Sequence, residues 1–76
     1  MPKSTIDMEE TCKKIKDLCT EKNITAAGLA DTLGISRQAV YSWFTQKKMP
    51  SFDHLVEIAD VFEMPLDDLV VRKNIE

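Results

Sequence analysis

A chain of 76 residues with a net charge of −3 has room for one domain with one compact core. It contains no apolar run long enough to cross a bilayer, no signal-peptide layout and no low-complexity tract, so we expect a single cytoplasmic domain over 1–76. With one histidine, two cysteines and no pattern that pairs a nucleophile with a base, the sequence favours no metal, no cofactor and no enzymatic activity.

Charge is unevenly distributed along the chain. Residues 25–50 contain three basic residues and one acid, whereas residues 51–71 contain six acids and no Lys or Arg. The first block is therefore the internal part of the chain that suits a polyanion such as DNA, and the acidic block would help to orient the protein on it. A solvated helix face is the alternative explanation of these acids.

The first helix is predicted to begin between Ser4 and Asp7, where capping residues precede acids suited to the positive end of a helix. Its apolar stripe has helical spacing and consists of Met8, Cys12, Ile15, Leu18 and Cys19. Along a helix the two cysteines would lie roughly 10 Å apart, so they cannot form a disulfide with each other. We expect both as reduced core residues.

Residues 25–44 have the pattern of a helix, a turn and a second helix. Thr25 is suited to cap the first of these helices. The inner side of that helix carries Leu29, Ala30 and Leu33. Gly34 is expected to end it in the left-handed conformation, after which Ile35 can fold back onto the core.

Ser36 is expected to start the next helix, which has two distinct sides. At about 100° per residue, one side is apolar and consists of Ala39, Val40, Trp43 and Phe44. The opposite side is polar and consists of Gln38, Tyr41, Ser42 and Thr45, with Arg37 beside it in the first turn. A helix with one buried and one free side fits the major groove of B-DNA, where residues near its N-terminus can reach base edges.

After this helix the sequence predicts a basic loop at 46–50 and two further short helices. Pro50 closes the loop and Ser51 caps the fourth helix. The inner side of the fourth helix is predicted to consist of Phe52, Leu55, Ile58, Ala59 and Phe62. Pro65 starts a short fifth helix, in which Leu66, Leu69 and Val70 supply apolar contacts.

The stretch 25–44 resembles the helix-turn-helix motif of the phage-repressor (Cro and lambda repressor-like, Xre) family. The resemblance rests on residue types at five positions, namely Ala30, Gly34, Ile35, Val40 and Trp43. It covers about residues 8–71 and implies an all-α, compact five-helix lambda-repressor-like bundle whose helix-turn-helix is formed by the second and third helices. We therefore expect a core at about 8–71, with flexible ends at 1–4 and 72–76.

The sequence departs from the family pattern at a few positions. Many members have a Gln that contacts a phosphate where this chain has Ala26, and many close the third helix with a Gly where this chain has Gln46. Either that helix continues slightly or Gln46 adopts the left-handed conformation at some cost. Members often pair an Arg and a Glu at the positions of Cys19 and Phe44. Replacing both partners of a buried ion pair with apolar groups is often neutral or stabilising, so we expect these two side chains to be buried together.

The leading hypothesis is sequence-specific binding of double-stranded DNA by a small prokaryotic or phage-type transcriptional regulator, a repressor, that reads the major groove with its third helix. Gln38 would pair with adenine, and Arg37 would contact a phosphate or a guanine. The side chains that complete the reading face would be those of Tyr41, Ser42 and Thr45. The residues that hold phosphates would be Thr25, Ser36, Lys47 and Lys48.

The alternative is a helix-turn-helix fold that binds protein, as an antitoxin-like or regulator-binding module. The acidic block, the absent Gln at Ala26 and the small number of basic residues favour this alternative. Homodimerisation is expected for a DNA reader because one domain of this size reads few base pairs. The fifth helix and residues 70–75 are the predicted dimer contact.

Overall fold

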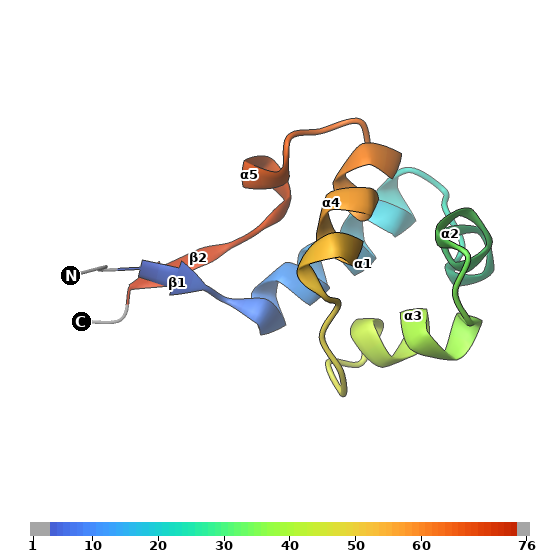
Figure 1. The fold of residues 1–76 in the computed structure, drawn as a ribbon, viewed down its shortest axis with the longest axis horizontal. Coiled ribbons are helices and arrows are strands. Elements are labelled where there is room, and N and C mark those ends of the chain that lie inside the picture. The colour runs from blue at the N-terminus through green and yellow to red at the C-terminus, as the bar shows by residue number, and fades with distance from the viewer. Residues whose placement is uncertain (1–3, 75–76) are drawn as a thin grey trace.

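The computed structural model describes residues 4–74, which form five short helices and a two-stranded antiparallel sheet (Figure 1). The helices are α1 (Met8–Glu21), α2 (Ala26–Leu33), α3 (Arg37–Phe44), α4 (Phe52–Val61) and α5 (Leu66–Leu69). The strands are β1 (Ser4–Ile6) and β2 (Arg72–Asn74). The predicted all-α bundle of five helices is confirmed, and the sheet joins the two ends of the described chain. Within residues 4–74 no helix is long and apolar enough to cross a membrane.

Four helices begin with a side chain that accepts a hydrogen bond from the backbone three residues later. Each such bond satisfies one of the amides that has no partner inside a helix. The bonds run from Glu10 N to Asp7 Oδ1 at 3.1 Å, from Gly28 N to Thr25 Oγ1 at 2.9 Å, from Ala39 N to Ser36 Oγ at 3.1 Å and from His54 N to Ser51 Oγ at 3.2 Å. The caps predicted at Thr25, Ser36 and Ser51 are therefore confirmed, and Asp7 is the cap within the range predicted for the first helix.

The core is built from one side of each helix. Its buried apolar residues are Cys12, Ile15, Cys19, Ala26, Leu29, Ala30, Val40, Trp43, Leu55, Ile58, Ala59, Phe62 and Leu69. Cys19 is buried as predicted, whereas Phe44 is half-buried and packs against the edge of this cluster. Both cysteines are free.

One predicted core residue lies on the outside. Phe52 is 64% exposed, although its spacing to Leu55 and Ile58 fits the inner side of α4. It is the first residue of the helix. Because a helical side chain leans toward the N-terminus of its helix, the first residue of α4 is directed away from the turns that cover the core, and the apolar period alone does not bury it.

The sheet was not predicted, and a buried threonine connects it to α1. The strands pair with Ser4 opposite Asn74 and Ile6 opposite Arg72. The pairing continues into Asp7, whose N–H donates to Val71 O at 2.7 Å. The Thr11 hydroxyl donates to Asp7 O at 2.7 Å and accepts from Val71 N at 3.0 Å, so it bridges the next pair of backbone groups. The sequence predicts flexible ends at 1–4 and 72–76. Residues 1–3 and 75–76 lie outside the described residues, whereas Ser4 and Arg72–Asn74 belong to the two strands.

Candidate nucleic-acid interface

The turn between α2 and α3 fixes the angle at which the two helices meet. Gly34 has a φ of +70°, the left-handed conformation that glycine adopts without a Cβ penalty. The Ile35 N–H donates to Ala30 O at 3.0 Å, which closes the end of α2 in the arrangement typical of a glycine-terminated helix. Ala30 is fully buried, as is Leu29 beside it. The helix, turn and helix predicted over 25–44 are confirmed.

The two sides of α3 differ as the periodicity predicts. Val40 and Trp43 are buried on the inner side. On the outer side Gln38 and Thr45 are exposed, Tyr41 is 55% exposed and Ser42 is half-buried. Arg37, in the first turn, is also exposed. The chain thus presents a helix of eight residues whose outer side consists of polar groups.

Most of the residues proposed to bind DNA line one open hollow. Seven of the nine take part, namely Ser36, Gln38, Tyr41, Ser42, Thr45, Lys47 and Lys48. Arg37 and Thr25 are exposed but lie outside its lining. Among the described residues that line this hollow none is acidic, so the two lysines give it a positive charge.

The hydroxyls on the outer side of α3 are already donors within the helix. Ser42 Oγ donates to Ala39 O at 2.5 Å, and Thr45 Oγ1 donates to Tyr41 O at 3.0 Å. A hydroxyl whose proton is used in this way retains its lone pairs. Toward a base edge these two side chains are therefore acceptors, which suits an exocyclic amino group such as cytosine N4 or adenine N6.

The hydroxyls that cap α2 and α3 are, by contrast, available as hydrogen-bond donors. Thr25 Oγ1 and Ser36 Oγ each accept a backbone N–H, so their own protons are free to be donated. Both stand at helix N-termini, where the helix dipole and unpaired amides favour an anion. This geometry can hold a phosphate oxygen.

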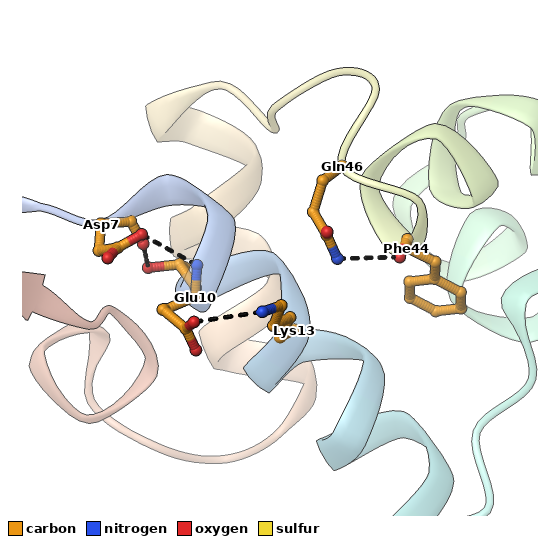
Figure 2. Close-up of polar contacts among 6 residues, drawn as sticks. Asp7, Glu10, Lys13, Phe44 and Gln46 are labelled. Carbon is orange, nitrogen blue, oxygen red and sulfur yellow. Dashed lines mark hydrogen bonds and ion pairs between the residues drawn. The ribbon is translucent and has the colours of Figure 1, made fainter.

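Gln46 adopts the left-handed conformation, one of the two alternatives that the sequence allowed at the end of α3. Its φ is +58°, and its side-chain Nε2 donates to Phe44 O at 3.2 Å, back toward the end of α3 (Figure 2). The helix therefore stops at Phe44 instead of continuing into the loop. The lysines that follow are both exposed.

Three residues of the hollow were not singled out from the sequence as site residues: Met49, Ser51 and His54. Met49 lies in the loop after α3, Ser51 is the cap of α4 and His54 lies in its first turn. The His54 ring lies 5.4 Å from the Trp43 ring, centroid to centroid, at an interplanar angle of 48°. No local pattern in the sequence indicates that these three residues line the hollow, because their place there depends on how the chain folds after α3.

The cysteines do not contribute to this site. Both thiols are buried, and Cys12 Sγ lies 3.6 Å from Met49 Sδ. Burial raises the pKa of the Cys12 thiol and raises the pKa of Cys19 to about 11, which keeps both neutral near pH 7. Within residues 4–74 no group of three or more His, Cys, Asp or Glu side chains is placed to hold a metal ion.

Comparison with known proteins agrees with this geometry. A helix-turn-helix family model matches residues 15–69. The chain belongs to the helix-turn-helix family. It is 34% identical over 58 residues to the HTH-type transcriptional activator BcrR of Enterococcus faecalis, a match that covers 76% of this chain and 28% of the relative.

A second relative comes from an archaeon. The chain is 33% identical over 54 residues to a protein of Methanocaldococcus jannaschii named as an HTH-type transcriptional regulatory protein, MJ1164, with 71% of this chain and 17% of the relative covered. The chain therefore spans less than a third of the length of either relative. No solved structure gives a significant match.

Proposed function

We propose that this helix-turn-helix domain binds double-stranded DNA in a sequence-specific manner and regulates transcription, with α3 in the major groove. The observation that carries the proposal is the hollow in which the polar outer side of α3 meets Lys47 and Lys48 without an acidic neighbour in the lining. A helix fits the major groove, and phosphate-binding groups at its edges fix its register. The names of the two relatives, an activator and a regulatory protein, support the same function.

Each exposed residue then has a role that its chemistry allows. Gln38, near the start of α3, pairs with adenine through its amide, and Arg37 contacts a phosphate or a guanine. Tyr41, Ser42 and Thr45 complete the reading face. Phosphates are held by the remaining four residues, Thr25, Ser36, Lys47 and Lys48.

Repression is the simplest mode of action for this domain in the cytoplasm, because occupation of an operator needs no contact beyond the DNA. Activation, which the name of one relative carries, would need a further contact with the transcription machinery. We propose a homodimer as the binding species, because one α3 helix reads few base pairs and two half-sites are needed for useful specificity.

Selection from a pool of random duplexes tests the proposal directly. It is expected to enrich a common sequence, and the affinity for the enriched duplex should fall steeply as salt rises. The matched control is a scrambled duplex of the same composition, which should bind more weakly at every salt concentration. If no sequence is enriched and binding is absent at low salt, the DNA-binding function is excluded.

One observation favours a second candidate function, the binding of a protein. Phe52 is 64% exposed on a helix whose other exposed residues include Asp53 and Glu57. An aromatic side chain surrounded by charged residues is typical of protein interfaces. In this alternative the protein acts as an antitoxin-like or regulator-binding module, and a protein partner would bind with the same affinity whether or not α3 carries its polar residues.

A further inference from the structure

Tyr41 is the exposed aromatic side chain on the outer side of α3. Among the described residues, the large apolar side chains with high exposure are Ile6, Tyr41, Met49, Phe52 and Val56. Of these five, Tyr41 belongs to α3. Its ring is 55% exposed and lines the open hollow beside that helix, which we call the reading hollow. A ligand that fills the reading hollow therefore covers an apolar ring as well as polar groups.

The neighbours of Tyr41 on this side of the helix are polar. Gln38 lies three positions before it and Thr45 four positions after it, so both side chains are adjacent to the ring on the helix surface. Both are exposed, and both line the reading hollow. Thr45 Oγ1 donates its proton to Tyr41 O at 3.0 Å, so it is an acceptor toward a ligand. The ring thus stands between an amide and a hydroxyl at the centre of the reading face.

The major groove offers one apolar group to such a ring. Thymine carries a methyl group at C5, whereas the other groups that distinguish the four bases in this groove are hydrogen-bond donors and acceptors. Cytosine carries the same methyl group once it has been methylated at C5. Aromatic and aliphatic side chains contact this methyl group through apolar surface, which is removed from water when the complex forms. Tyr41 is therefore suited to a 5-methylpyrimidine.

Helical spacing places this contact next to the base that Gln38 would read. Residues three apart on a helix have Cβ atoms about 5–6 Å apart, and successive base pairs are stacked about 3.4 Å apart. Gln38 and Tyr41 therefore face the same base pair or neighbouring ones. The amide of Gln38 suits adenine N6 and N7, and an A·T pair presents the thymine methyl in the same groove. The two side chains together favour a site that contains an A·T pair.

Among the described residues, Met49 is the other exposed apolar side chain in the reading hollow, at 40% exposure. Its Sδ lies 3.6 Å from the buried Cys12 Sγ, so the thioether already has a partner in the protein interior. Tyr41 has the larger exposed fraction and stands on the reading helix itself. The apolar contact with a base is therefore assigned to Tyr41.

We infer that Tyr41 contacts the 5-methyl group of a pyrimidine in the major groove, so that the protein recognises a thymine by its methyl group and accepts 5-methylcytosine in its place. The inference rests on the proposed DNA-binding function and adds the chemical group that one position of the site carries. A site with cytosine at this position is then bound more tightly once that cytosine is methylated.

Uracil scanning of the duplex enriched by selection tests the inference. Uracil lacks the methyl group of thymine and has the same hydrogen-bonding groups, so each thymine is replaced in turn and Kd is measured by fluorescence anisotropy. Burial of one methyl-sized group is worth about 0.8 kcal/mol, which corresponds to about fourfold in Kd. We expect wild type to bind one of the uracil duplexes about fourfold more weakly than the parent duplex and the others as tightly as the parent.

Variants assign the methyl effect to the ring. Tyr41→Phe keeps the ring and should keep the difference between the thymine and uracil duplexes, whereas Tyr41→Ala should bind both equally. Phe52→Ala is the matched control and should keep the difference, because Phe52 is an aromatic residue that is 64% exposed and lies outside the lining of the reading hollow. Thermal melts establish that each variant is folded, and Tyr41→Gln gives the same test if Tyr41→Ala does not fold.

A second set of duplexes places the methyl group on another base. At the position found by uracil scanning, the T·A pair is replaced with C·G and with 5-methyl-C·G. Wild type should bind the methylated duplex about fourfold more tightly than the unmethylated one, and Tyr41→Ala should bind both equally. Equal binding of these two duplexes by wild type would contradict recognition through the methyl group.

Three results of uracil scanning would overturn the inference and leave the DNA-binding function intact. One is an enriched sequence that has no thymine, or whose thymines can all be replaced with uracil without loss of affinity. Another is a methyl effect that persists in Tyr41→Ala. The third is loss of the effect in Tyr41→Phe, which would assign it to the phenol hydroxyl. If wild type binds no duplex at low salt, the DNA-binding function itself fails.

Discussion

Helices α3 and α4 have the same construction on the inside and opposite chemistry on the outside. Each starts after a serine that accepts a hydrogen bond from an amide three residues later, and each buries apolar side chains such as Val40 or Ile58. The outer side of α3 has no acid, whereas that of α4 carries Asp53 and Glu57. The comparison shows that the fold constrains the inner half of a helix and leaves the outer half free to specify a partner.

The largest effect on stability is expected for a substitution on the buried side of α1. Cys19→Arg should lower the free energy of unfolding by about 3 kcal/mol or more, because it buries a charge without a partner. Urea unfolding monitored by Trp43 fluorescence measures it. The control is Thr20→Arg, at the next, exposed position of α1, which should change stability by less than about 0.5 kcal/mol. Equal losses in the two variants would mean that Cys19 is not part of the packed interior.

The Cys19 thiol also makes the free energy of unfolding depend on pH. Burial raises the pKa of Cys19 from 9.0 to about 11, so the unfolded chain releases the proton first as pH rises. The stabilising neutral thiol is fully present below pH 9, and about 2–3 kcal/mol is lost as the pH rises to about 11. Urea unfolding at several pH values measures the loss. Cys19→Ala should be less stable at pH 7 but should lose less stability between pH 9 and pH 11; identical losses would contradict the assignment to Cys19.

The contrast between the outer sides is sharpened by removing one exposed polar side chain from each. Gln38→Ala should lose about 1–3 kcal/mol of binding free energy on the selected duplex and much less on a scrambled one. Glu57→Ala, the control on α4, should lose no affinity for either duplex. Fluorescence anisotropy with both duplexes measures these changes, and an equal loss in the two variants would end the distinction between the helices.

A smaller effect distinguishes a residue that contacts a phosphate from a residue that contacts a base. Lys47→Ala should weaken all duplexes alike and lower the slope of log K against log salt by roughly one, because one phosphate contact is lost. Lys16→Ala removes an exposed lysine from α1 and should leave the slope unchanged. Titrations at four salt concentrations measure both. A loss confined to the selected duplex would show that Lys47 reads sequence.

The smallest effect concerns the end of α3. Gln46 has a φ of +58°, so Gln46→Gly should stabilise the domain by about 0.5–1 kcal/mol by removing the Cβ penalty. Thr45 has a φ of −95°, and Thr45→Gly should destabilise it by a similar amount. Thermal melts compare the two variants. If both destabilise the protein, the hydrogen bond from the Gln46 side chain to Phe44 O outweighs the backbone strain.

Local chemistry determined the helices and their ends. Capping by Thr25, Ser36 and Ser51, termination at Gly34 and the two sides of α3 depend on neighbours in the sequence, within one or two turns. These features, and with them the five helices and the polar outer side of α3, could be predicted from the residues alone. The roles assigned to the residues of that outer side stay predictions.

Tertiary structure decided what depends on residues far apart in the chain. The sheet pairs Ser4–Ile6 with Arg72–Asn74, and beside it Thr11 accepts a hydrogen bond from Val71 N, 60 positions along the chain. No local pattern specifies either contact. Phe52 fits the apolar period of α4, yet it is 64% exposed at the first position of that helix. Likewise, Ser51 and His54 line the reading hollow because the fold places the start of α4 near α3, where the His54 ring lies 5.4 Å from the Trp43 ring. Periodicity specifies the direction in which a side chain points, whereas its burial depends on whether another element covers that direction.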